Sequence, residues 1–246
     1  MADPLMRTAV AVAILVALTV VTLRAVKAPR GWSAAYAVLR CAVQLTVLSL
    51  VLGGIISDAR WVALFAAVMF AVACWTAVGR LGLTDRRASW VMGAMAAGAM
   101  VALTVVFSTG AVDREARYVL AVCGIVIGGT MTTATLAGRR LVAGLNDRWD
   151  EVEGWLALGA TPRESTVVIA REAVAEALIP SMDQTRTTGL VTLPGAFVGA
   201  IFGGASPLDA GRFQLVVLAA ILAAGAVTGS VLTWGLSPVK EKPQAL

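Results

Sequence analysis

The amino-acid sequence predicts an all-α polytopic membrane protein, with about seven transmembrane helices and a short cytoplasmic helix between the fifth and the sixth. Hydrophobic residues make up 59% of the 246 and charged residues only 14%, whereas a soluble domain carries about a quarter charged residues. The apolar residues form continuous runs without the alternation of barrel strands, so they satisfy their backbone groups in hydrocarbon as helices. We expect a single transmembrane domain over residues 1–246.

Seven runs are predicted to cross the bilayer, which takes roughly 20 apolar residues in a helix. In order they are 5–23, 32–56, 61–78, 90–107, 118–136, about 179–202, and 213–234. The sixth run is unusual, because its purely apolar part, 189–202, is short and is interrupted by Pro194 and Gly195. Short membrane helices that Pro or Gly interrupts are typical of substrate sites in transporters.

The Lys and Arg residues predict the orientation in the membrane. They concentrate after the first, third, fifth and last runs, whereas the alternate loops hold fewer: Arg60, then Arg114 and Arg117, then Arg212. The positive-inside rule therefore places the N-terminus outside and the C-terminus in the cytoplasm, in the cell (inner or plasma) membrane. The net charge of +5 comes from these basic loops, which would lie beside anionic lipid. Nucleic-acid binding is not expected, because the sequence has no basic cluster interleaved with aromatic residues.

The residues that enzymes use most are scarce. The sequence has no histidine, and Cys41, Cys74 and Cys123 lie singly in apolar runs without the CxxC spacing of metal sites. No GxxxxGK[ST] phosphate loop occurs. A membrane-embedded enzyme is therefore not favoured, no cofactor is expected on this chain, and metal ligands stay unassigned.

One long polar stretch, whose cytoplasmic part covers about 137–178, separates the fifth and sixth runs. Asn146 or Asp147 is predicted to cap a helix over 148–158 that ends at Gly159, and the 161–164 segment, TPRE, has the pattern of a capping box. Helical spacing places an apolar set on one side of this helix: Trp149, Val152, Trp155 and Leu156.

The same segment resembles the EAA-type cytoplasmic loop of ABC-transporter permeases, on Glu153, Gly154 and Trp155 followed by Gly159 and the LGATP run at 158–162. It departs from that pattern where Gly154 and Trp155 replace two alanines and where Arg171-Glu172 replaces Leu-Pro. The resemblance implies a coupling helix that docks on a separate ABC ATPase subunit, with these candidate contact residues: Trp149, Val152, Glu153, Trp155, Leu156 and Gly159.

A second resemblance is more specific. The runs ALIPSMDQTR at 177–186 and GLVTLPGAFVGAI at 189–201 resemble the FetB family, permease subunits of a bacterial iron-export ABC transporter that are similar to plant aluminium-tolerance membrane subunits. The resemblance covers essentially the whole chain. It implies export of a metal ion or another small solute, ATP and Mg²⁺ used by the partner ATPase, and a homodimer, since an ABC transporter needs two ATPase subunits and each chain offers one coupling segment.

Residues in the second run, and in or just before the sixth, are candidates for the translocation route, because polar groups in a span face a partner or a cavity and interrupted helices line substrate sites. They are Arg40, Gln44, Glu172, Glu176, Met182, Asp183, Arg186, Thr192, Pro194 and Gly195. Arg40 either pairs with an acid or a helix carbonyl, or lines the route. The three carboxylates either form a stripe that suits hard cations, or a solvated face paired with Arg171 and Arg186. The competing function is an ATP-independent secondary transporter or channel, which would not need the 148–158 helix.

Overall fold

A computed structural model of the chain describes residues 4–29, 32–55, 58–83 and 85–243. In the described part the regular structure is helical, apart from a single β-bridge between Thr188 and Thr192, which confirms the all-α prediction. Contacts divide the chain into two compact units, Met1–Asp58 and Ala59–Leu246. Each unit is described by itself.

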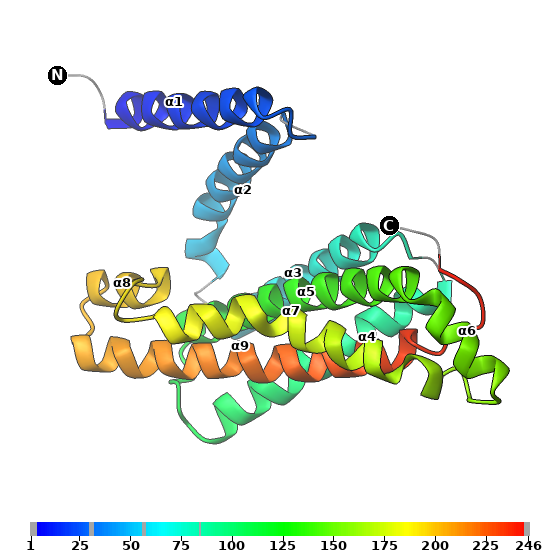
Figure 1. Cartoon of the computed structure of the whole chain (residues 1–246). Coiled ribbons are helices and arrows are strands. Elements are labelled where there is room, and N and C mark those ends of the chain that lie inside the picture. The colour runs from blue at the N-terminus through cyan, green and yellow to red at the C-terminus, as the bar shows by residue number, and fades with distance from the viewer. Residues whose placement is uncertain (1–3, 30–31, 56–57, 84, 244–246) are drawn as a thin grey trace. The chain divides into compact units, whose positions relative to one another are not determined.

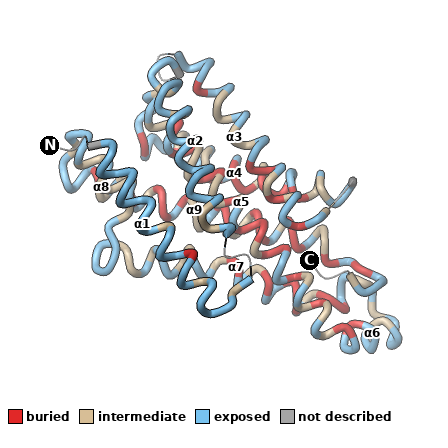
Figure 2. Tube along the Cα trace, turned by 90° about the horizontal axis from the view of Figure 1, so that it is seen from above, coloured by how far each residue is buried: buried red, intermediate tan, exposed pale blue. Residues whose placement is uncertain are grey.

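The first unit is a hairpin of two apolar helices, α1 (Pro4–Ala25) and α2 (Ser33–Ile55). Nearly all of their side chains are exposed, as the pale blue of both helices in Figure 2 shows. Exposing so much apolar surface to water would be energetically unfavourable, whereas lipid tails are as apolar as leucine and impose no such cost. Exposure of this kind fits helices that face a bilayer.

The second unit is a bundle of five long helices, with short helices at its two ends (Figure 1). Its members are α3 (Ala59–Arg80), α4 (Asp85–Ser108), α5 (Ala116–Asp147), α6 (Trp149–Ala157), the 3₁₀ turn η1 (Glu164–Thr166), α7 (Val167–Thr187), α8 (Gly195–Phe202) and α9 (Pro207–Leu236). Helix α9 packs against α4, α5 and α7, and α5 also packs against α3 and α7. The buried core therefore follows α5 and α9.

Six described helices are long and apolar enough to cross a membrane: α1, α2, α3, α4, α5 and α9. Helix α7 is too charged to be counted with them, but its 21 residues extend about 30 Å at 1.5 Å per residue. It runs beside α5 and α9 from the α6 end of the bundle to the α8 end (Figure 1). By length and packing, α7 is the seventh helix of spanning size.

The predicted span at about 179–202 is therefore wrong in its bounds. Helix α7 ends at Thr187, a loop follows, and α8 begins at Gly195. Gly189 adopts a φ of +90° in that loop, a conformation that ends helices and that glycine adopts without steric cost. The prediction followed apolar content, whereas the chain forms its long helix from the more polar residues before it.

Close packing of α4 on α9 depends on small residues. A Cβ added to Gly98 of α4 would overlap the Thr228 hydroxyl oxygen and the Ala224 carbonyl oxygen of α9. Small residues of this kind let membrane helices approach each other closely. Gly93, on the same helix, has nothing within 4 Å of its Cβ position.

We expect Gly98→Ala to lower the free energy of unfolding by roughly 1–3 kcal/mol, because α4 and α9 must separate to admit the methyl group. Gly93→Ala adds the same methyl group to the same helix without a contact and should leave stability unchanged or slightly raised. Thermal unfolding of the detergent-purified variants, followed by tryptophan fluorescence, measures both. Equal melting temperatures for the two variants would contradict this account of the α4–α9 contact.

Candidate functional site

One candidate site lies where α6 follows α5. The 32 residues of α5 extend about 48 Å, well beyond a hydrocarbon core of about 30 Å. Trp149 and Val152 of α6 are buried, and they join a cluster with Leu141 of α5 and Ile169 of α7. Trp149 Nε1 also donates a hydrogen bond of 2.7 Å to Glu153 Oε1. These contacts hold α6 against its own chain.

The predicted C-terminal end of α6 is confirmed. Gly159 has a φ of +92°, its N–H donates to the Leu156 carbonyl at 3.0 Å, and the Ala160 N–H donates to the Trp155 carbonyl at 3.0 Å. This pair of bonds is the Schellman motif, which satisfies the last carbonyls of a helix. A residue other than glycine would be strained at this position.

The predicted N-terminal cap is wrong. Arg148 occupies the cap position, without a side-chain capping bond. Asn146 Nδ2 donates instead to the Val142 carbonyl at 2.9 Å, because α5 continues through Asp147 and leaves no break for Asn146 to cap. Helix α6 therefore begins at Trp149, within one residue of the predicted start.

The predicted capping box is present after α6. The Thr161 N–H donates to Glu164 Oε2 at 2.8 Å, and the Glu164 N–H donates to Thr161 Oγ1 at 3.3 Å. The bonds from the Thr161 backbone and hydroxyl hold the pKa of the Glu164 carboxyl below its usual range, because they favour the charged form. The turn that leads into α7 is thus fixed by its own sequence.

The exposed side of α6 differs from the side that the helical spacing selected. Trp155 is 51% exposed and Leu158, one turn later, is 82% exposed. They lie among exposed acidic residues: Asp150, Glu151 and Glu153. Of the other candidates, Trp149 and Val152 are buried, Leu156 is half-buried, and Gly159 is exposed. Leu158 was missed, although its spacing of three from Trp155 was a usable signal.

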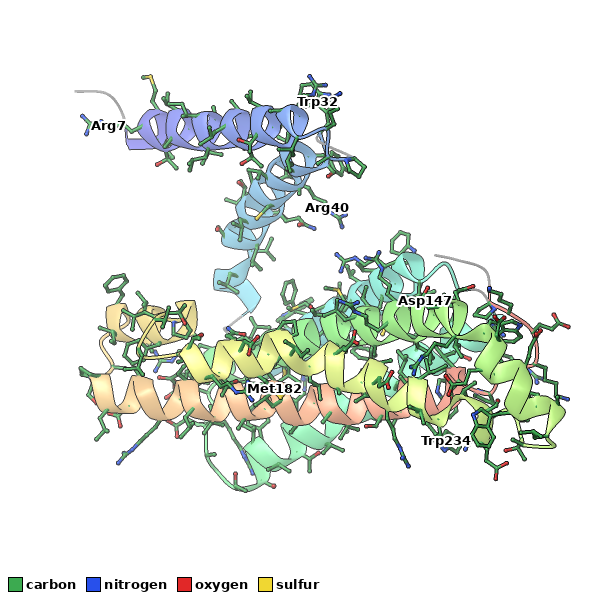
Figure 3. The ribbon with its side chains drawn as sticks, in the orientation of Figure 1. Arg7, Trp32, Arg40, Asp147, Met182 and Trp234 are labelled. Carbon is green, nitrogen blue, oxygen red and sulfur yellow. The ribbon has the colours of Figure 1, made fainter. Side chains whose placement is uncertain are left out.

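A stack of three side chains attaches the turn after α6 to two other helices. The ring centroids of Trp90 in α4 and Trp234 in α9 are 5.6 Å apart, and the Arg163 guanidinium lies 3.9 Å from the Trp234 ring centroid. Trp90 Nε1 donates to the Val231 carbonyl at 2.9 Å. Cation–π contacts and stacked rings add attraction beyond area burial. Trp234 is labelled at this end of the bundle in Figure 3.

The second candidate site is the exposed face of α7. Arg171, Glu172, Glu176, Asp183 and Arg186 are all exposed in the single chain. Their ion pairs differ in part from the predicted pairs. Glu172 pairs with Arg148, and Glu176 Oε2 lies 3.1 Å from Arg140 Nε. Arg140 lies on α5 and Arg148 is the cap that follows its last residue, so these two carboxylates link α7 to α5 rather than pair along α7.

Asp183 lies about 10 Å further along α7 than Glu176, at 1.5 Å per residue. Its Oδ1 is 3.5 Å from Arg186 NH1, and the two side chains are 60% and 74% exposed. The helix runs through Pro180, as the acidic stripe requires, although proline removes one helix hydrogen bond. Met182, labelled in Figure 3, is half-buried. Asp183 is thus the α7 carboxylate that no arginine of α5 pairs with.

The Pro/Gly break lies beyond the end of α7. Pro194 is the cap of α8, and Gly195 is its first residue. The Gly189 N–H donates to the Thr192 carbonyl at 2.9 Å, and the Val191 N–H donates to the Thr187 carbonyl at 2.9 Å. The loop therefore satisfies much of its backbone internally, and Thr192 itself is exposed.

Two further candidates belong to the first unit. Arg40 and Gln44 lie one turn apart on α2, both exposed, in the first unit (Figure 3). Within the ranges that the structure describes, no three His, Cys, Asp or Glu side chains are grouped closely enough to hold a metal ion. The α7 carboxylates, each beside an arginine, are spread along the helix rather than gathered.

Comparison with known proteins places the chain in a family. Residues 6–238 match the model of an uncharacterised protein family, UPF0014. The UPF0014 membrane protein STAR2 of Oryza sativa subsp. japonica is 34% identical over 201 residues, which cover 81% of this chain and 70% of STAR2. Protein ALUMINUM SENSITIVE 3 of Arabidopsis thaliana is 33% identical over 205 residues, 81% of this chain and 75% of that protein.

A bacterial relative carries a transport name. The protein named "Probable iron export permease protein FetB" of Escherichia coli (strain K12) is 28% identical over 191 residues, 77% of this chain and 74% of FetB. No solved structure matches the chain. The resemblance to FetB and to the plant aluminium-tolerance proteins is confirmed, and the chain belongs to the UPF0014 family of membrane proteins.

Proposed function

We propose that this chain is the membrane-spanning permease subunit of an ABC transporter that exports a metal ion or another small polar solute. The observation that carries the proposal is the charged face of α7. A helix of spanning length exposes two arginines, two glutamates and an aspartate in the single chain. Ionisable side chains inside a membrane face a partner or a water-filled route, because lipid does not solvate them.

A homodimer would provide that partner. Two copies that bring their α7 faces together would remove the charged surface from lipid and enclose a polar passage between them. Each copy would also present one α6, which suits the two ATPase subunits of an ABC transporter. Asp183, about 10 Å beyond the Glu176 pair, would then lie along the passage.

ATP hydrolysis is assigned to a separate subunit, which would bind ATP and Mg²⁺ itself. Support comes from α6 and its C-terminal cap, which expose Trp155 and Leu158 on a helix anchored by buried Trp149. Exposed aromatic residues with a rigid support are typical interface anchors. The acidic residues beside them favour a partner groove with an apolar floor and a basic rim. An ATP-independent transporter or channel would use α7 without needing this surface.

We propose that the N-terminus lies outside and the C-terminus in the cytoplasm of a cell membrane, from the asymmetry of Lys and Arg. Cysteines substituted at Ser108 and Asp209 should react with an impermeant thiol reagent in intact cells, in a background without the native cysteines. Cysteines at Asp85 and Asp147 should react only after the cells are opened. The reverse labelling pattern would refute this orientation.

The function is tested by co-expressing the chain with an ABC ATPase encoded beside its gene and isolating the tagged permease. We expect the ATPase to co-purify, and the reconstituted complex to move metal ions across liposomes only when ATP and Mg²⁺ are supplied. Transport that proceeds equally well without the ATPase would favour the secondary transporter or channel. If the complex forms but metal ions do not move, the substrate is another polar solute.

A further inference from the structure

The joint between α5 and α6 is a single residue, Arg148. Helix α5 ends at Asp147 and α6 begins at Trp149. The Arg148 N–H donates to the Gly144 carbonyl at 3.1 Å, and the Val152 N–H donates to the Arg148 carbonyl at 3.3 Å. The Arg148 backbone has a φ of −116° and a ψ of 32°, whereas a helix has about −63° and −42°. The chain therefore changes direction at this one residue (Figure 1).

The side chain of the same residue reaches α7. Arg148 Nη1 donates to Glu172 Oε1 at 3.5 Å, and Arg148 Nη2 donates to Glu172 Oε2. Two parallel contacts of this kind fix the relative orientation of the guanidinium and the carboxylate as well as their separation. The two residues are 24 positions apart in the chain. Their pair therefore closes a loop that consists of α6, the turn after it and the start of α7.

A second ion pair supports the first. Glu176 Oε2 lies 3.1 Å from Arg140 Nε. Arg140 and Arg148 each lie four residues from Gly144, so the three positions follow one side of α5. A Cβ added to Gly144 would lie 2.8 Å from Ile169 Cγ2, just before α7 turns past these pairs. The two ion pairs thus flank a point where α7 approaches α5 closely.

The pair at Arg148 adds direction to the joint rather than stability to the fold. Its two side chains are 34% and 53% exposed, and exposed ion pairs contribute little to the stability of a folded protein. Buried Trp149 and Val152 already hold α6 against its own chain. The ion pair acts on the joint itself, so it restricts the angle between α5 and α6 rather than the formation of α6.

We propose that Arg148 is a positioning residue that ties α6 to the charged face of α7, so that a displacement of α6 moves α7 instead of bending the chain at the joint. This inference rests on the proposed function, in which α6 docks on an ATPase and α7 borders the passage. While the pair is intact, the loop is closed and the start of α7 follows α6. When the pair is removed, the joint takes up part of the displacement.

The first measurement uses the full-length chain alone, in lipid nanodiscs. Hydrogen exchange of the α6 amides, followed by mass spectrometry, reports how often this segment opens. Arg148→Gln and Glu172→Gln should each speed the exchange by about two- to fivefold, the value of an exposed ion pair. The double variant should exchange no faster than the single variants, because each single change already removes the pair.

Asp147→Asn is the matched control. Asp147, labelled in Figure 3, directly precedes the joint and is exposed. It lines the same pocket of about 120 Å³ as both ion pairs, but it takes part in neither of them. The variant removes a charge at the joint without removing a pair, so its α6 amides should exchange at the wild-type rate.

The second measurement follows α7 while an ATPase acts on α6. A spin label is attached to Gln184→Cys, on the exposed face of α7, in a background without the native cysteines. In the complex with the ATPase, ATP and Mg²⁺ should change the spectrum of the label. Arg148→Gln should at least halve that change although the ATPase stays bound, because Trp155 and Leu158 are unaltered. Asp147→Asn should keep the full change. A residue that only supported the fold would lower ATPase binding as well.

Wild-type exchange of α6 in both single variants would overturn the inference, as would a double variant in which the two effects multiply, because the two residues would then act independently. A spectral change in Arg148→Gln as large as in the wild type would also overturn it, since motion would then reach α7 by another route. By contrast, a wild-type chain that binds no ATPase would refute the proposed function itself, and the role of Arg148 in transmission would fall with it.

Discussion

We expect Asp183→Asn to reduce transport by roughly 10- to 100-fold, which is the value of a hydrogen bond or ion contact to a charged group. Asparagine keeps the size and the hydrogen-bonding shape of aspartate but removes the charge. Asp183 lies on the exposed face of α7, and its described ion pair is with Arg186 of the same helix. Transport is measured as ATP-dependent metal-ion flux in proteoliposomes that contain the permease and its ATPase.

The chain offers a closely matched control for this substitution. Asp209 lies 3.5 Å from Arg212, also three residues later, and the two side chains are 64% and 72% exposed. It belongs to the first turn of α9, where its N–H donates to the Oγ of the capping residue Ser206 at 3.1 Å. Asp209→Asn should retain near wild-type transport. Equal loss in both variants would mean that Asp183 acts through general surface charge rather than through its place on α7.

The double substitution Trp155→Ala and Leu158→Ala should release the ATPase from the permease. Trp155 of α6 and Leu158, the cap that follows α6, are both exposed, and truncation of a central interface anchor commonly costs 2 kcal/mol or more, about 30-fold in affinity. Co-purification and ATPase activity stimulated by the permease measure the effect. The folded bundle should persist, because the buried residues Trp149 and Val152 that anchor α6 are unchanged.

Trp75→Ala is the control for removing an exposed indole. Trp75 is 79% exposed on α3, a helix apolar enough to cross the membrane, so the variant should bind the ATPase normally.

Gly159→Val tests the exposed surface of α6 in another way, because valine is strained at a φ of +92° and should disturb the end of α6. Wild-type binding by the α6 double variant would refute the coupling role of this helix.

The sequence predicted α6 closely because local signals define it. Gly159 and the Thr161–Glu164 capping box act within a few residues, so their geometry could be read without the rest of the fold. The side of α6 that faces the chain could not be read in this way. Whether Trp149 or Trp155 is buried depends on where α5 and α7 pack, which helical spacing alone does not specify.

The ion-pair partners of the α7 carboxylates also could not be predicted from the sequence, because they come from a segment that is distant in the chain. Arg148 and Glu172 are 24 residues apart, and Arg140 and Glu176 meet because α5 and α7 pack together. The sequence suggested Arg171 and Arg186 as partners because they are near in the chain.

The stack of Arg163, Trp234 and Trp90 gives α6 a second point of attachment. A helix joined only to α5 could swing about that joint without moving its neighbours. Here the turn after α6 is also fastened to α9 and, through the paired rings, to α4. Force applied to α6 by a bound protein would therefore be shared among three membrane helices, so that this end of the bundle would tilt as one block.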